Sequence, residues 1–147
     1  MAGKKKKTGQ AIKQLGSAAR SVRTALAERL LSHGFYAGQD QIMIALGQRE
    51  TMTPGELAGE LGVRPPTVTK TINRLSEQGF VDRRTSTADA RQSEVFLTEK
   101  GRNALDDIAT SIEATEELAL DGMGKKDRRQ LRKLLAQVEA NLAGEKD

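Results

Sequence analysis

Cysteine is absent from this 147-residue sequence, and histidine occurs only once, as His33. Without cysteine the chain can form no disulfide bond, no thiolate zinc site and no thiol-based redox sensor. A single histidine also argues against a transition-metal site of the usual kind. We therefore expect a protein that needs no metal ion and no cofactor.

Long apolar runs are also missing. No segment approaches the roughly 20 apolar residues that a membrane-spanning helix needs. The lysine run Lys4–Lys7 is followed by a mixed helical pattern and not by the apolar block of a secretory signal. These features predict a soluble, cytoplasmic protein that does not bind membranes.

The sequence contains no recognisable catalytic motif. It has no G-x-G-x-x-G or phosphate-loop glycine run, and no pair of carboxylates in an apolar setting. Glu116 and Glu117 are adjacent, but their charge-rich helical surroundings are typical of a solvated surface. We therefore expect that the protein is not an enzyme.

The most informative segment runs from Thr53 to Thr98 and begins with a short helix. Thr53 suits the N-cap position, Pro54 suits the first helical position, and Glu56 completes a capping box. Gly62 is expected to stop this helix after about two turns.

A second helix is predicted after a tight turn. It begins at Arg64-Pro65-Pro66, and Val68, Ile72 and Leu75 form a single apolar stripe at spacings of four and three. The other positions are mostly polar or cationic, so this helix shows a hydrophilic face to something outside the core. Gly79 ends the helix, and a strand follows.

This order of elements predicts a winged helix-turn-helix, a mainly α fold with a small antiparallel β-hairpin. The hairpin loop, residues 85–92, is polar and carries Arg91. In helix-turn-helix proteins the second helix enters the major groove of DNA. An arginine on an extended loop can enter a narrow minor groove. The segment therefore predicts DNA binding.

Charge is segregated along the chain, whose formal net charge is +4. Residues 64–91 hold six cations against three anions, whereas residues 98–122 hold two cations against seven anions. The positive charge thus falls on the predicted DNA-binding segment, which supports that prediction. Chance segregation of surface charge is the alternative.

Long amphipathic helices are predicted on both sides of this segment. Apolar residues recur three or four apart between Ile12 and Leu31, after the helix cap at Thr98, and between Leu131 and Leu142. They carry more apolar surface than one small core can cover, which predicts pairing with a second copy. The alternative is that these helices pack only on their own domain.

We accordingly divide the chain into four parts. They are a disordered basic arm (1–10), an N-terminal dimerisation helix (11–37), a winged helix-turn-helix DNA-binding domain (38–101) and C-terminal dimerisation helices (102–147). The lysines of the arm repel one another and bury nothing. They either touch DNA phosphates outside the main footprint or form a solvated tail.

The same residues resemble the MarR family of bacterial transcriptional regulators. The resemblance lies in Asp89-Ala90-Arg91, in Leu97-Thr98-Glu99-Lys100-Gly101, and in the residues that begin and end the second helix, 62–69 and 75–81. Together these motifs are far more specific than any one of them. They cover roughly residues 39–101, and the flanking helices fit the family in length and position.

Nine residues are predicted to serve DNA binding. Thr67, Thr69 and Lys70 occupy the first turns of the second helix and are assigned to base edges. The other six are assigned to phosphates, the minor groove or support of the wing: Arg64, Asn73, Arg74, Arg84, Asp89 and Arg91.

Some of these roles remain open. Arg83 and Arg84 are equally well explained as phosphate partners or as plain surface cations, and the polar helix face could simply be solvated. Similarity to the family's wing implies that Asp89 orients Arg91 and does not itself meet DNA. The two prolines remove two N–H donors at the start of the helix, so no backbone amide there is assigned to a phosphate.

The resemblance also implies a homodimer that binds a pseudo-palindromic operator, acts as a repressor and is released by a small aromatic or phenolic anion. His33, Phe35, Tyr36 and Met43 lie at the corresponding junction and are the candidate ligand-binding residues. The alternative is that they are ordinary packing residues. For the whole protein the alternatives are a protein-interaction module, or a non-specific DNA binder without a ligand response.

Overall fold

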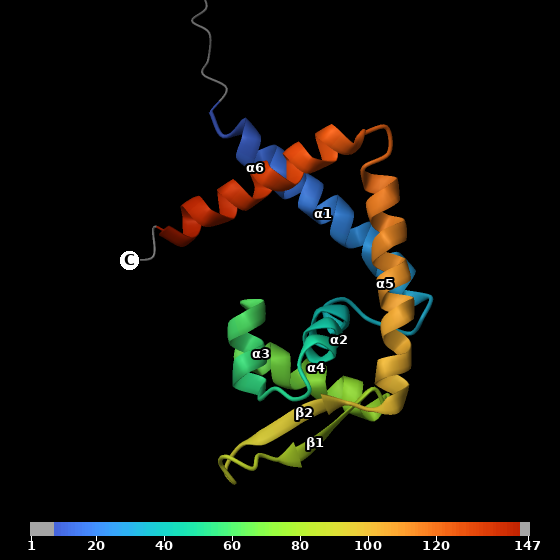
Figure 1. The fold of residues 1–147 in the computed structure, drawn as a ribbon, viewed down its shortest axis with the longest axis vertical. Helices are drawn as coiled ribbons and strands as arrows, with labels where there is room; N and C mark the ends of the chain where they lie inside the picture. The colour runs from blue at the N-terminus through green and yellow to red at the C-terminus, as the bar shows by residue number, and fades with distance from the viewer. Residues whose placement is uncertain (1–7, 145–147) are drawn as a thin grey trace, which may run out of the picture. The chain divides into compact units, whose positions relative to one another are not determined.

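The structure, a computed structural model, describes residues 8–144. They form two compact units, one up to Glu113 and the other from Ala114 onward. In chain order the elements are α1 (Gln10–Leu31), α2 (Gln39–Gln48), α3 (Pro54–Leu61), α4 (Pro65–Glu77), β1 (Val81–Thr85), β2 (Ser93–Leu97), α5 (Glu99–Ala119) and α6 (Lys125–Gly144) (Figure 1).

The helix-turn-helix predicted from the sequence is confirmed. The Thr53 hydroxyl accepts the Glu56 backbone N–H at 3.1 Å, and Pro54 is the first residue of α3. Gly62 ends α3 in the left-handed conformation, at φ +63°, which a residue with a Cβ adopts poorly. Arg64 is extended, as expected of a residue before proline, and α4 begins directly after it.

The wing is a two-stranded antiparallel hairpin with a short addition. β1 and β2 pair from Val81 opposite Leu97 to Thr85 opposite Ser93. Met52, in the connection between α2 and α3, adds an isolated bridge to Val95, with N–O distances of 3.1 and 2.8 Å in the two directions. No pattern in the sequence predicted this bridge.

The core of the first unit lies between α2, α3, α4 and the hairpin (Figure 1). The stripe predicted for α4 faces inward, since Val68, Ile72 and Leu75 are all 1% exposed or less. Leu30 from α1 and Ile108 from α5 close the same core. Burying a side chain of this size stabilises the fold by about 1.5–3 kcal/mol, so this stripe fixes which face of α4 remains outside.

The start of α5 is tied to the end of α4. Thr98 accepts the Gly101 backbone N–H at 3.1 Å, as predicted for a helix cap, and donates its hydroxyl to Gly79 O at 2.6 Å. A Cβ on Gly101 would lie 2.1 Å from Phe80 O, so no other residue fits there without movement. Lys100 donates to Gln78 O at 2.7 Å. Thr98 and Gly101 of the leucine-threonine-x-x-glycine motif are therefore required to join the start of α5 to the end of α4.

The flanking helices expose apolar side chains. Ile12 in α1 is 72% exposed, Leu134 and Leu142 in α6 are 51% and 61% exposed, and α6 has no buried residue. α1 begins at Gln10, inside the segment predicted as an arm, while Lys4–Lys7 lie outside the described residues. Within residues 8–144, no helix is long and apolar enough to cross a membrane.

Candidate nucleic-acid interface

The outward face of α4 is polar and exposed. It carries the five helical residues predicted to meet DNA: Thr67, Thr69, Lys70, Asn73 and Arg74. The Thr69 hydroxyl donates to Pro65 O at 3.1 Å, and the Thr71 hydroxyl donates to Thr67 O at 2.9 Å. With its hydroxyl proton used by the helix backbone, Thr69 has its methyl group available for an apolar contact.

The first four residues of α4 offer no free backbone N–H to a ligand. Pro65 and Pro66 have none, and the amides of Thr67 and Val68 donate to Arg64 O at 3.0 and 3.2 Å. An anion near this end of the helix would therefore have to be bound by side chains. Arg64, the exposed N-cap residue, is the cation closest to this point in the sequence.

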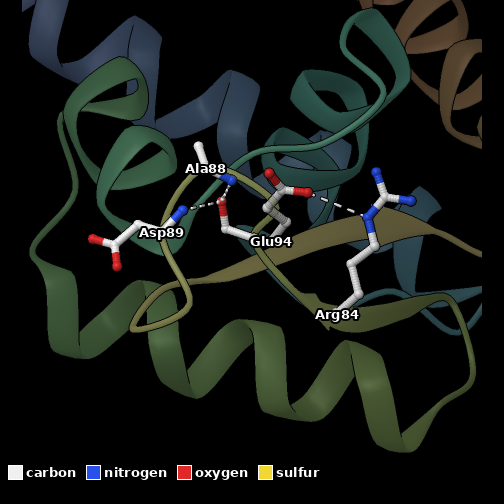
Figure 2. Close-up of polar contacts among 5 residues, drawn as sticks. Arg84, Ala88, Asp89 and Glu94 are labelled. Carbon is white, nitrogen blue, oxygen red and sulfur yellow. Dashed lines mark hydrogen bonds and ion pairs between the residues drawn. The ribbon is translucent and has the colours of Figure 1, made fainter.

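The hairpin separates the two arginines that the sequence left equivalent. Arg83 donates from Nη2 to Asn73 Oδ1, so its side chain lies beside α4. Arg84 is the next residue in the strand and faces the other way. Its Nε lies 3.2 Å from Glu94 Oε2 (Figure 2). Its guanidinium carbon lies 5.5 Å from the Phe96 ring centroid. The geometry favours Arg83 over Arg84 as a DNA contact.

Only Arg84 was included in the predicted DNA-binding set, although the sequence explained both arginines equally well as phosphate partners or as surface cations. Alternation along a strand places Arg83 and Arg84 on opposite faces. Arg83 lies on the same face as Val81, which is buried, although Arg83 itself is exposed. Only the position of α4 next to the exposed end of the strand decides which face meets the helix. That information is not local to the hairpin.

The wing loop, residues 86–92, has a fixed shape. The buried Ser86 hydroxyl accepts the backbone N–H groups of Ala88 and Asp89 at 3.2 and 3.4 Å (Figure 2). Ser86 N donates to Gln92 O at 2.9 Å and closes the loop. Ser86 was not among the residues predicted from the sequence to support the wing. A serine at the end of a strand that is followed by an aspartate three residues later is a recognisable turn signal.

Asp89 and Arg91 are brought together as the family resemblance implied. Asp89 Oδ1 accepts the Arg91 backbone N–H at 3.0 Å and lies 3.6 Å from Arg91 Nε. The Arg91 side chain is 94% exposed. A carboxylate thus holds the backbone of the loop tip while the guanidinium extends into solvent.

The four predicted ligand-binding residues do not share one environment. Phe35 is 1% exposed and Met43 is 0% exposed, so both lie in the core. Tyr36 is 44% exposed and its ring lies against Arg74, with 3.8 Å between the ring centroid and Cζ. His33 lies at the surface with Nδ1 3.7 Å from Asp107 Oδ2. Two of the four are therefore placed to meet a ligand without unpacking the core.

Asp40 is a buried carboxyl group that the sequence analysis did not single out. It is the second residue of α2 and is 7% exposed. Burial raises its pKa above the ordinary value of 3.8, while backbone N–H groups at the start of α2 and the charge of Arg23 act in the opposite direction. Because the charge of Arg23 in α1 acts on Asp40 in α2, Asp40 belongs to the junction between α1 and α2.

Known proteins similar to this chain point to one family. The sequence model described as the MarR family matches residues 36–93. The HTH-type transcriptional regulator YwoH of Bacillus subtilis (strain 168), which is described as uncharacterized, is 32% identical over 117 residues, covering 80% of this chain and 85% of that protein. This chain belongs to the MarR family.

Solved structures agree with this assignment at the level of the fold. The transcriptional regulator SlyA matches with a TM-score of 0.83 at 21% identity, over 92% of this chain and 96% of that one. A mutant MarR from E. coli complexed with operator DNA matches with a TM-score of 0.80 at 21% identity, over 86% and 91%. The match to the MarR family model spans Tyr36 to Ser93 and so includes α4 and the wing loop.

Proposed function

We propose that this MarR-family transcriptional regulator acts as a homodimeric repressor that binds a pseudo-palindromic operator through α4 and the wing. One observation carries the proposal. The exposed polar face of α4 continues through the Asn73–Arg83 hydrogen bond onto the hairpin, where Arg91 projects from the wing loop. This surface is cationic and its backbone shape is fixed, as direct and minor-groove readout of DNA require.

Base reading falls to the first turns of α4. Lys70 can donate to guanine O6 and N7, and the Thr69 methyl group can pack on a thymine methyl. Thr67, one turn nearer the start of the helix, completes the set. Phosphates are met by Arg64, Asn73, Arg74 and Arg83, because the start of α4 has no free amide for them.

The wing supplies a minor-groove contact. Arg91 enters the groove while Asp89 keeps the loop tip in shape through the backbone N–H of Arg91. A narrow A·T-rich minor groove concentrates negative potential, and this favours an inserted guanidinium. The role implied for Asp89 is therefore support of Arg91 and not DNA contact.

Dimerisation would cover the apolar side chains that α1 and α6 expose. A two-fold dimer places two recognition helices one helical turn of DNA apart, about 34 Å, and so matches a pseudo-palindromic site. The E. coli relative complexed with operator DNA supports DNA binding by this fold. The domain boundaries given above, with dimerisation helices on both sides of residues 38–101, belong to this proposal.

A small aromatic or phenolic anion is the effector that we propose for this regulator. It would bind at the junction that contains His33 and Tyr36, while Phe35 and Met43 belong to the core. A change there that altered the spacing of the two recognition helices would lower the affinity for DNA, because half-sites at fixed spacing tolerate little shift.

The proposal is tested by a salt titration of DNA binding. The probe is a duplex that carries the region upstream of the chain's own gene, with random DNA as competitor. Tight binding that falls steeply with salt and resists the competitor supports a sequence-specific regulator. If random DNA displaces the duplex as well as the duplex itself does, the protein is a non-specific DNA binder. If the protein does not bind the duplex at all, the protein-interaction module is the better interpretation. Salicylate is then added as a phenolic acid to test for release.

A protein-interaction module is the weaker candidate on one observation. A winged helix that docks on another protein would need apolar side chains on the outer face of α4. That face instead carries Thr67, Lys70 and Arg74, all of them exposed and hydrophilic.

A further inference from the structure

The connection between α1 and α2, residues 32–38, is hydrogen-bonded to the end of the recognition helix. Gln78, the C-cap residue of α4, donates from Nε2 to Gly34 O at 2.9 Å and accepts at Oε1 from Gln39 Nε2 at 2.8 Å. Gln39 Oε1 in turn accepts the Tyr36 backbone N–H at 2.9 Å. We call Gln39 and Gln78 the glutamine clasp.

The burial of Gln39 makes its side of the glutamine clasp a fixed part of the domain, whereas Gln78 is only partly buried. Gln39 is 1% exposed, and its amide has a partner on both its oxygen and its nitrogen. A buried amide that lost its partner would carry the full cost of desolvation, whereas a fully paired network in a low-dielectric site strengthens each of its bonds. The clasp therefore holds residues 34–36 in one place against α4.

The same connection supports Arg74. Its Cζ atom lies 3.8 Å from the Tyr36 ring centroid, and the neighbouring Phe35 ring lies 4.7 Å from that of Phe80. Phe35 anchors the connection in the core, while Tyr36 extends from it under the guanidinium. Tyr36 is 44% exposed, so the stacked group remains at the surface where DNA would pass.

Stacking of this kind favours a phosphate contact. A guanidinium that lies on an aromatic ring keeps its N–H donors at its edge and free to bind an anion. The ring also removes rotamer freedom that an arginine would otherwise lose when it binds DNA. Tyr36 thus holds the Arg74 guanidinium in a restricted orientation in the free protein.

We propose that Tyr36 is a positioning residue for DNA binding, which acts by holding Arg74 ready for a phosphate, and that the glutamine clasp fixes Tyr36 for this task. This inference rests on the proposed function. It assigns to Tyr36 a role that is independent of any effector, and it assigns roles to Gln39 and Gln78, neither of which was among the predicted site residues.

The stack can be tested without DNA, because Tyr36 is the only tyrosine and the chain has no tryptophan. Tyrosine fluorescence therefore reports on this one ring, and its quenching by acrylamide reports on the access to it. Arg74→Ala and Gln78→Ala should both increase quenching. Arg83→Ala removes a cation on the same surface that does not touch Tyr36, so it is the control and should leave quenching unchanged.

DNA binding is then measured on the upstream duplex in a double-mutant cycle. Tyr36→Leu should weaken binding about three- to tenfold, as expected for an arginine that loses its support. Tyr36→Phe keeps the ring and should remain within about twofold of the parent. In the Arg74→Ala background, Tyr36→Leu should have no further effect. Gln78→Ala should weaken binding in the same direction as Tyr36→Leu, with Gln48→Ala, at the end of α2, as its control.

The outcomes separate this inference from the proposed function. Unchanged affinity in folded Tyr36→Leu and Gln78→Ala, or an equal loss for Tyr36→Leu with and without Arg74, overturns the positioning role. Unchanged quenching in Arg74→Ala overturns the stack itself. If the parent protein binds no duplex, the proposed function fails and the positioning role fails with it, whereas the quenching data still decide whether the stack exists.

Discussion

At the scale of single residues, the exposed arginines of this chain are not equivalent. Arg91 has its side chain 94% exposed at a braced loop tip, Arg83 is joined to Asn73, and Arg84 is joined to Glu94. Arg84 and Arg91 both lie near a carboxylate, but Arg84 Nε is 3.2 Å from Glu94, which is 17% exposed, whereas Arg91 Nε is 3.6 Å from Asp89, which is 42% exposed. The charge of Arg84 is therefore balanced more completely, and Arg84 attracts a phosphate less strongly than Arg91 does. Sequence position alone therefore does not decide which cation binds DNA.

Arg91→Ala tests the wing. We expect a loss of about 1–3 kcal/mol on the specific site, as for other direct contacts, because the minor-groove guanidinium is removed. Binding isotherms on operator and random DNA measure it. Lys126→Ala, an exposed cation of α6, serves as the control. An affinity for the operator that stays at the parent value would contradict the assignment of Arg91.

Arg83→Ala and Arg84→Ala form a matched pair. Arg83→Ala should weaken binding to all sequences and reduce the slope of log affinity against log salt by about 1, the value expected for one phosphate contact. Arg84→Ala should change the slope much less, because Arg84 is paired with Glu94. The opposite ranking would place the other face of the hairpin on DNA.

At the scale of elements, local signals predicted the helix-turn-helix well. The cap at Thr53, the stop at Gly62 and the stripe from Val68 to Leu75 each depend on residues within a few positions of one another. Such signals act through backbone hydrogen bonds and one-sided burial, and both can be read from sequence. The order of helices and strands was therefore predictable.

Features that depend on distant partners were not predictable. Met52 joins the wing as a single bridging residue and so has no periodicity to detect. The bond between Gln39 and Gln78 joins residues 39 positions apart. Phe35 was expected near a ligand, yet it is 1% exposed in the core. In each case tertiary packing decides the role, and a residue's own sequence neighbourhood does not encode it.

Asp40 at the start of α2 gives a prediction for stability against pH. Burial raises the pKa of Asp40 in the folded state above the ordinary value of 3.8. Between the pKa of the unfolded state and that of the folded state, the folded protein therefore binds more protons than the unfolded chain. Stability should therefore decrease as pH rises through this window. Asp40→Asn removes the buried charge, and it should raise the free energy of unfolding at pH 7 and lose this advantage near pH 3.

The measurement is urea denaturation of both proteins across this pH range. Asp106→Asn, an exposed carboxylate of α5, controls for the loss of one negative charge. A variant that is less stable than the parent at pH 7 would mean that hydrogen bonds to the Asp40 carboxylate outweigh its burial.

At the scale of the whole molecule, the proposed homodimer would cover the exposed apolar side chains of α1 and α6. Leu134 and Leu142 are 51% and 61% exposed on one side of α6. Exposed apolar surface of this kind is unfavourable in water, and a second copy of the chain can cover it. Two linked recognition helices would also bind a two-part operator far more tightly than one.

Leu134→Glu with Leu142→Glu should therefore convert the protein to a monomer. Charges placed in a buried apolar interface are unpaired there and strongly oppose association. Affinity for the full operator should fall by about 100-fold or more, toward that of a single half-site, because the second binding event is no longer intramolecular. Light scattering measures the mass, and titration of full-site and half-site duplexes measures the affinity.

The matched control is Ala136→Glu with Ala140→Glu, which adds the same two charges to exposed positions on the other side of α6. This control should remain dimeric and bind the full operator like the parent, because its new charges stay in water. If the leucine variant also kept the dimer mass and the parent affinity, α6 would not lie in the dimer interface. The stripe on α1 would then have to account for pairing alone, and Ile12→Glu would be the change that separates the subunits.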